Sequence, residues 1–67
     1  MPTLWVYDLA TKEVIAEIEG ADNKACEGVA SERWGDTDYF GWTYSPAFGV
    51  TDGLIQRGDI AAVKAVL

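Results

Sequence analysis

The sequence predicts a single α+β domain over residues 1–67, in which a β-hairpin, a helix and a further strand form an antiparallel sheet of three to four strands. The period of the apolar residues indicates this fold, because it is two over 3–7 and 13–19, helical over 22–34, and two again over 39–44. A chain of 67 residues is too short for two independent cores, and its hydrophobic fraction of 49% is typical of a folded domain. We therefore expect the helix to pack on one face of the sheet.

The alternation predicts two strands, at 3–7 and 13–19, each with one buried face. The apolar face of the second strand consists of Val14, Ala16 and Ile18. Between the strands, 8–12 has the length of a tight hairpin loop. Asp8 can accept hydrogen bonds from the turn backbone, and Lys12 occupies a position where a left-handed residue, usually Gly, is preferred.

Helical spacing over 22–34 predicts one amphipathic helix with Asp22 as its N-cap. The apolar stripe consists of Cys26, Val29, Ala30 and Trp34. Gly28 lies inside this helix, where it costs up to about 1 kcal/mol relative to Ala, so we expect the helix backbone to lie close to the sheet or to a partner there. Gly35 is expected to end the helix in a left-handed turn.

A third strand is predicted at 39–44, with the aromatic residues Phe40, Trp42 and Tyr44 on one face. Glycines make 50–57 an irregular segment or a short edge strand. For 60–67 two structures stay open. A short C-terminal helix capped by Asp59 is favoured over a strand, although the segment is short and rich in β-branched residues.

The residues needed for most catalytic and metal sites are missing from the sequence. It contains no histidine and a single cysteine, Cys26, so it lacks the usual triads, zinc ligand sets and an internal disulfide. We expect Cys26 to be a small buried apolar residue. The stretch 36–47 begins like a calcium loop, but Phe40 and Ala47 stand where oxygen ligands are required. We therefore predict no enzyme, no metal and no cofactor.

Charge limits the classes of partner. Eleven acidic residues against five basic ones give a net charge of -6, and the basic residues are scattered. Direct binding to nucleic acid or to an anionic membrane is therefore not expected, and a basic protein surface is the natural partner. The alternative is that the acids serve only solubility. The single thiol, together with an N-terminal sequence unlike a signal peptide, predicts a cytoplasmic setting, and the small core favours a homodimer as additional support.

The aromatic residues form the best candidate for a binding surface. Six of the eight aromatic residues lie between Trp34 and Phe48, interspersed with two aspartates. Tyr and Trp are enriched among residues that dominate binding at protein interfaces. The residues predicted to bind a partner are Asp36, Asp38, Tyr39, Trp42 and Tyr44. In the alternative interpretation, the aromatic residues of the third strand pack under the helix and Tyr39 is ordinary surface.

The chain resembles small proteins encoded by bacteriophages and prophages. The resemblance rests on its acidic composition and length, a hairpin that begins Leu4-Trp5-Val6-Tyr7-Asp8, a single helix and an aromatic third strand. In size and charge the chain is similar to anti-CRISPR proteins and other inhibitors of host defence. The resemblance implies a protein that blocks a basic surface of a nucleic-acid-processing host protein, and it assigns no residue a role. The second hypothesis is a structural or assembly subunit that acts through homo-oligomerisation.

Overall fold

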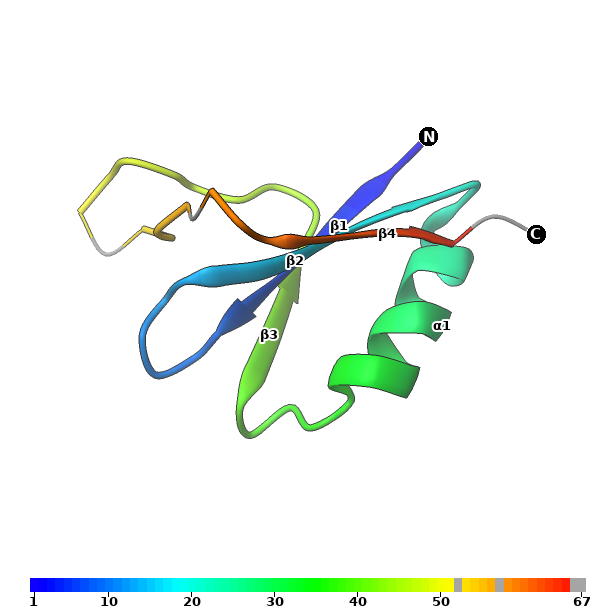
Figure 1. Cartoon of the computed structure of the whole chain (residues 1–67), viewed down its shortest axis with the longest axis horizontal. Coiled ribbons are helices and arrows are strands. Elements are labelled where there is room, and N and C mark those ends of the chain that lie inside the picture. The colour runs from blue at the N-terminus through cyan, green and yellow to red at the C-terminus, as the bar shows by residue number, and fades with distance from the viewer. Residues whose placement is uncertain (52, 57, 66–67) are drawn as a thin grey trace.

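A computed structural model describes residues 1–51, 53–56 and 58–65 of the chain. These residues form, in order, β1 (Thr3–Asp8), β2 (Val14–Gly20), α1 (Asn23–Trp34), β3 (Phe40–Thr43) and β4 (Ala61–Ala65). Figure 1 shows the sheet with α1 on one side of it. The α+β class and the packing of one helix on one sheet face are therefore confirmed. The predictions for 50–57 and 60–67 extend over Asp52, Arg57, Val66 and Leu67, which lie outside the described residues.

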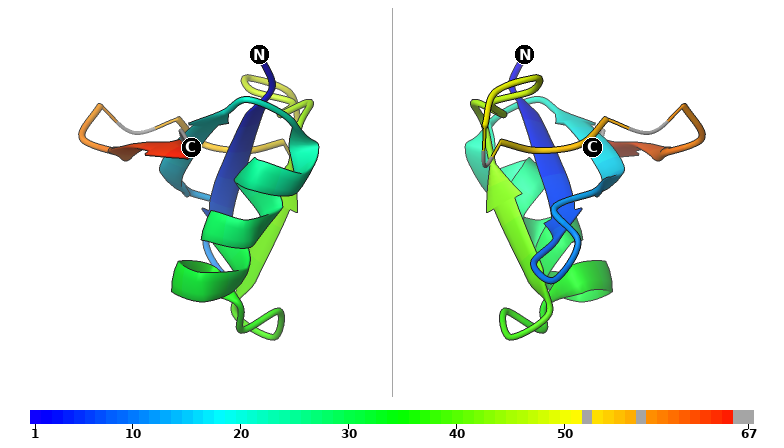
Figure 2. Two further views of the ribbon diagram at one scale, coloured as in Figure 1. Left: turned by 90° about the vertical axis from the view of Figure 1, so that its right-hand side faces the viewer. Right: turned by 90° about the vertical axis from the view of Figure 1, so that its left-hand side faces the viewer.

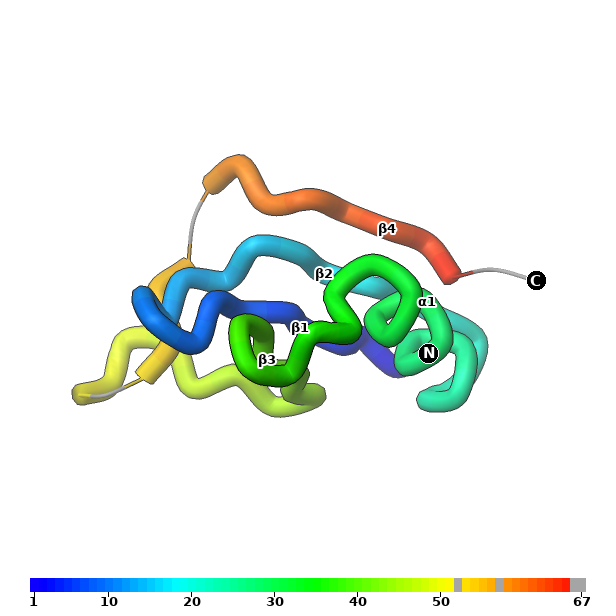
Figure 3. The backbone as a smooth tube through the Cα atoms, turned by 90° about the horizontal axis from the view of Figure 1, so that it is seen from below, coloured from blue at the N-terminus to red at the C-terminus, as the bar shows by residue number. Residues whose placement is uncertain are grey.

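The sheet has the strand order β3-β1-β2-β4. β1 runs antiparallel to both of its neighbours, whereas β4 runs parallel to β2. The prediction of an antiparallel sheet is therefore correct for two pairs and wrong for the third. The reason is that the chain crosses the whole sheet between β3 at one edge and β4 at the other, as the tube in Figure 3 shows.

The two crossover connections lie on opposite faces of the sheet. β2, β3 and β4 are parallel to one another. From β2 to β3 the chain moves toward one edge of the sheet, and from β3 to β4 it moves toward the opposite edge. Crossovers between parallel strands are almost always right-handed, and two crossovers of one hand that move in opposite directions must lie on opposite faces. In Figure 2, α1 covers one face, and the described residues between β3 and β4 lie across the other. We call these the helix face and the loop face.

The hairpin turn has the hydrogen bonds that its sequence predicts. The Asp8 Oδ1 atom accepts hydrogen bonds from the backbone N–H groups of Ala10 at 2.8 Å and Thr11 at 3.2 Å. Lys12 has φ 64°, so the left-handed position is occupied by a lysine. Both predictions for this turn are confirmed.

A bulge in the hairpin separates the buried residues of β2 into two groups. Val14, Ala16 and Ile18 are all buried, as their alternation predicts. The register shifts at the end of β1, however, so that Val6 pairs with Ala16 but Tyr7 pairs with Val14. An extra residue in one strand changes which side chains share a face. Val14 is accordingly buried outside the core cluster that lies under α1.

The core lies between α1 and the two central strands. Its buried residues are Leu4, Val6, Ala16, Ile18, Cys26, Ala30 and Ala65. Val29 and Trp34 of the predicted helical stripe pack against this cluster. Full burial of one Leu, Ile or Val side chain contributes roughly 1.5–3 kcal/mol, so this cluster is the main source of stability. The prediction that Cys26 is a buried apolar residue is confirmed.

The helix begins as predicted and ends differently. The Asp22 Oδ1 atom accepts a hydrogen bond from the Ala25 N–H at 2.8 Å, which confirms the N-cap. Gly35 has φ -75° and ψ -9°, so the predicted left-handed turn is wrong. A Cβ atom at Gly35 would overlap the carbonyl oxygen of Ser31, and glycine is needed there for close approach.

Gly28 is exposed, and a Cβ atom added to it would meet nothing within 4 Å. Of the two neighbours expected for the helix backbone at this position, the sheet is therefore wrong, and a partner stays a prediction. Gly28 still costs up to about 1 kcal/mol relative to Ala in an exposed helix, and no contact within the described residues accounts for it.

The last described segment is a strand, so the favoured C-terminal helix is wrong. Val63 pairs with Ile18, and Ala65 pairs with Gly20 next to the helix. Ala65 is buried in the core cluster, and Val63 packs against it. Pairing with β2 therefore buries Ala65 and partly buries Val63, and this tertiary gain outweighs the helical spacing of so short a segment.

The segment after β3 covers the loop face through aromatic and backbone contacts. The rings of Trp5 and Phe48 meet edge to face, with centroids 5.5 Å apart. Ile55 donates a backbone hydrogen bond to Lys12 at 2.8 Å and accepts one from Val14 at 2.9 Å. In its described part, 50–57 is thus irregular, with isolated bridges at Leu54 and Ile55.

Candidate functional site

Residues 36–39 form an exposed turn between α1 and β3, which we call the acidic turn. The Asp36 side chain accepts a hydrogen bond from the Asp38 N–H at 3.1 Å, and its carbonyl accepts bonds from Tyr39 and Phe40 at 3.0 Å. The Tyr39 carbonyl in turn accepts a bond from the Leu9 N–H at 3.0 Å. The backbone of the turn is therefore fixed at both ends, while its side chains face solvent.

The acidic turn presents one aromatic ring next to two carboxylates. The side chain of Tyr39 is 66% exposed, and both aspartates are exposed. A carboxylate that accepts a backbone hydrogen bond is held in one orientation, as for Asp36. The structure thus brings together three of the predicted partner-binding residues: Asp36, Asp38 and Tyr39.

Trp42 belongs to the packing of the helix face. Its side chain is half-buried and packs against the core cluster. The indole Nε1–H donates a hydrogen bond to the Trp34 carbonyl at 3.2 Å, close to the end of α1. Trp42 therefore fits the alternative interpretation, in which the aromatic residues of β3 pack under the helix.

Tyr44 lies beyond the other end of β3, six residues from Asp38, which corresponds to about 20 Å of extended chain. Its hydroxyl donates a hydrogen bond to Glu27 Oε2 at 2.7 Å and lies 3.1 Å from the Asn23 carbonyl. Partial burial of the phenol and the Glu27 carboxylate raise the pKa of Tyr44 from 10.0 to about 12. The pair of Tyr44 and Glu27 is thus a second, separate polar group.

Sequence reasoning missed the role of Glu27. Glu27 is exposed, and it follows Asn23 by one helical turn, so that both contact the Tyr44 hydroxyl at the end of β3. The spacing of four residues is visible in the sequence. The position of Tyr44 beside them depends on the crossover between α1 and β3, so it could not be inferred from the sequence.

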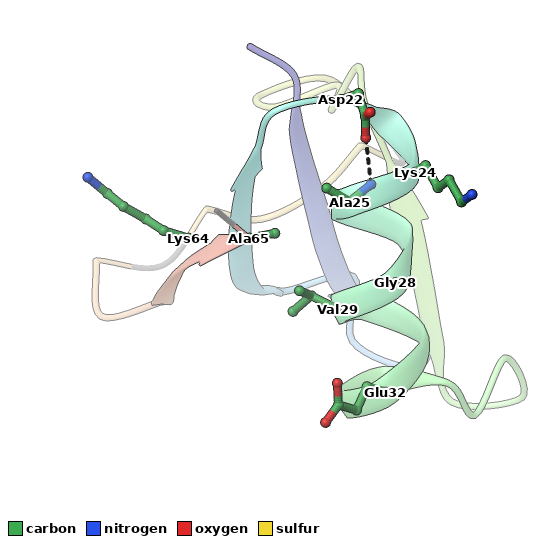
Figure 4. Close-up of a pocket in the computed structure, with 8 residues that line it drawn as sticks. All are labelled: Asp22, Lys24, Ala25, Gly28, Val29, Glu32, Lys64 and Ala65. Atoms are coloured by element: carbon green, nitrogen blue, oxygen red, sulfur yellow. Dashed lines mark hydrogen bonds between the residues drawn. The ribbon is translucent and has the colours of Figure 1, made fainter. Parts of the chain in front are cut away.

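A groove of about 610 Å³ separates α1 from β4, and we call it the α1–β4 groove. It is lined by Asp22, Lys24, Ala25, Gly28, Val29, Glu32, Lys64 and Ala65. In Figure 4, Val29 and Ala65 point toward each other across the groove, whereas the amino groups of Lys24 and Lys64 extend away from it. Asp22 and Glu32 lie at its two ends. The sequence did not indicate this groove, because it exists only where the last segment is a strand.

The described residues offer little for metal or redox chemistry. Among them, no group of three or more His, Cys, Asp or Glu residues could hold a metal ion. The Cys26 thiol is buried, with its sulfur 3.6 Å from the carbonyls of Pro2 and Ile18. In the described part of the chain, no helix has the length and apolar character required to cross a bilayer. A second cavity, of about 190 Å³, lies between Tyr7 and Leu54 on the loop face.

Comparison with known proteins returned no relatives: no protein-family model matches the chain, and no curated protein or solved structure shows significant similarity to it. The function is therefore argued from the residues of this chain alone. The acidic turn, the pair of Tyr44 and Glu27, and the α1–β4 groove are its candidate sites.

Proposed function

We propose that the protein is a non-enzymatic binding module whose acidic turn docks on a basic surface of another protein. One observation carries the proposal: Asp38 and Tyr39 face solvent from a turn whose backbone is hydrogen-bonded at both ends. A fixed turn loses little conformational entropy on binding. A net charge of -6 steers the molecule toward a basic partner.

A more specific form of this proposal is a phage-type inhibitor. Proteins that process nucleic acids bind phosphates through clustered Lys and Arg residues. A rigid acidic turn with an aromatic ring can occupy such a cluster and compete with the nucleic acid. The likeness of the chain to small acidic phage proteins supports this form.

The proposal gives the predicted residues different roles. Asp38 and Tyr39 are proposed to contact the partner, and Asp36 to contribute charge while it holds the turn. Tyr44 with Glu27 forms a second contact at the opposite end of β3. Trp42 supports the strand from the helix face.

Charge can be removed from the turn without loss of its hydrogen bond. Asp36→Asn combined with Asp38→Asn retains a side-chain oxygen to accept the Asp38 N–H bond. Glu17→Gln with Glu19→Gln on β2 is the matched control, because each double substitution changes the net charge from -6 to -4. All three proteins are used to capture partners from a bacterial lysate, and the captured proteins are quantified by mass spectrometry.

We expect the wild type and the β2 control to capture the same basic protein, and the acidic-turn variant to lose it. Nucleic acid added to the lysate should displace the captured protein if the inhibitor form is correct. Equal capture by all three proteins would refute a role of the acidic turn, and an acidic captured partner would refute the charge argument.

A second candidate function is a subunit that acts by homo-oligomerisation. In the described part of the chain, β3 and β4 are the two edges of the sheet and each pairs on one side only. An unpaired edge can add a strand from another copy. Sedimentation at several concentrations separates this function from the first, because a module for a different partner stays monomeric.

A further inference from the structure

Among the described residues, α1 leaves part of the helix face uncovered. Strands in a sheet lie about 4.8 Å apart, and helices pack about 8–10 Å apart, so one helix covers about two strands. The sheet has four strands, and α1 packs mainly on β1 and β2 and only weakly on β4. Figure 3 shows α1 level with β1 and β2, to one side of β4. The α1–β4 groove is the place that a second helix would fill.

The walls of the groove suit a helix that lies close to α1. Val29 and Ala65 are apolar and point into it (Figure 4). Gly28 lines the same groove, and a Cβ atom added there would meet nothing within 4 Å. The absence of a side chain lets a second helix approach the backbone of α1 closely.

The charges at the groove identify the occupant. Lys24 and Lys64 also line the groove, but their amino groups extend away from it (Figure 4). The charges left at the groove are those of Asp22 and Glu32, which lie at its two ends, ten residues or about 15 Å apart. Two basic residues on one face of a partner helix would meet them if separated by three turns, or about 11 residues. A second copy of this chain is a poor occupant because both copies carry a net charge of -6.

An extended segment fits the groove less well than a helix. The free N–H and C=O groups of an edge strand lie in the plane of the sheet, so an added strand would extend the sheet beyond β4. The groove instead lies above β4, beside α1.

We propose that the α1–β4 groove docks one amphipathic helix of a partner protein, with small apolar residues toward Gly28 and Val29 and basic residues toward Asp22 and Glu32. This site goes beyond the proposed function, because it is formed by α1 and β4 rather than by the acidic turn.

Synthetic peptides test the site on the intact protein. The first peptide is a helix of about 18 residues with an Ala and Leu face and two Lys residues 11 positions apart. The second has both Lys residues replaced by Glu, and the third has a central Pro that prevents a helix. Binding is measured by fluorescence anisotropy and located by backbone amide NMR shifts. The protein variants are Gly28→Leu, which fills the groove, and Ser31→Leu, its control on the outer side of α1.

We expect the lysine peptide to bind and to shift the amides of Ala25, Gly28, Val29 and Ala65. Gly28→Leu, the Glu peptide and the Pro peptide should each weaken binding at least about tenfold, whereas Ser31→Leu should leave it unchanged. No binding by any peptide, equal binding of the Lys and Glu peptides, or shifts elsewhere would overturn the proposal. Equal binding of the Pro peptide would indicate an extended occupant, and a dimer that covers the groove would indicate a second copy; either result also refutes it.

The test separates this site from the proposed function. Asp36→Asn with Asp38→Asn should bind the lysine peptide as tightly as the wild type does. If that variant retains peptide binding but captures the same partners as the wild type, the acidic-turn proposal fails alone. If no peptide binds, while capture of the partner depends on the acidic turn, the groove proposal fails alone.

Discussion

The two faces of the sheet are covered by different kinds of structure. On the helix face, α1 seals a cluster of fully buried apolar side chains, including Leu4 and Ile18. On the loop face, an irregular segment covers half-buried Trp5 with the ring of its own Phe48 and is held by a few backbone hydrogen bonds. Apolar area removed from water is the main stabilising term in folding. Stability therefore resides mainly on the helix face, and substitutions on the loop face should cost less.

The largest effect is expected from a cavity on the helix face. Ile18→Ala removes a fully buried side chain and should lower the free energy of unfolding by about 2–5 kcal/mol. A domain of this size has about 3–5 kcal/mol from its core, so the variant should be largely unfolded by circular dichroism. Ile55→Ala, at an exposed site of the loop face, is the control and should change stability by less than about 0.5 kcal/mol. Equal losses of unfolding free energy in both variants would contradict the conclusion that stability resides on the helix face.

A double-mutant cycle on the loop face should give a smaller value. Trp5→Leu and Phe48→Leu, alone and together, isolate the edge-to-face contact at 5.5 Å. We expect a coupling energy of about 0.5–1.5 kcal/mol from urea unfolding, with a folded domain in every variant. A coupling energy near zero would mean that the segment after β3 is not held by this ring pair.

Gly28→Ala should raise stability. Nothing lies within 4 Å of the added Cβ atom, and alanine has the higher helix propensity, so we expect a gain of up to about 1 kcal/mol in thermal or urea unfolding. Ser31→Ala, on the outer side of α1, is the control and should give a smaller gain. A loss of stability in Gly28→Ala would contradict the open space beside this position.

Tyr44 ties the end of β3 to α1, and its pKa predicts a small pH effect. The ordinary pKa of 10.0 applies to the unfolded chain, and the folded value is about 12. The Tyr44 contribution to stability is therefore complete below pH 10 and is lost as pH rises through 12. Tyr44→Phe should remove this part of the pH dependence of unfolding, and Glu27→Gln should lower the pKa of Tyr44 in an ultraviolet titration. A Tyr44 pKa that does not change in Glu27→Gln would contradict the hydrogen bond.

Local patterns predicted the elements that depend on neighbouring residues. The hairpin turn with Asp8 and Lys12, and the helix capped by Asp22, follow from hydrogen bonds and φ preferences within a few residues. The strand at the end of the chain did not follow, because Val63 is buried only through pairing with Ile18, far away in the sequence. The parallel direction of β4 likewise depends on which face the crossover takes.

The candidate site also has a part that could be predicted from neighbouring residues and a part that could not. Asp36, Asp38 and Tyr39 are neighbours in the sequence, so their grouping in one turn could be anticipated. The contact of Tyr44 with Glu27 joins two elements, and only the crossover between them determines it. The α1–β4 groove was invisible to sequence analysis for the same reason, because it requires β4 to be placed at the edge of the sheet.

Calorimetric titration of the captured partner with wild type and with the Asp36→Asn, Asp38→Asn variant tests the central claim most directly. The claim is that burial on the helix face stabilises the fold, whereas the acidic turn binds the partner. It predicts an affinity at least about tenfold lower for the variant, with a melting temperature within about 3 °C of wild type. Equal affinity of the two proteins, both folded, would contradict it.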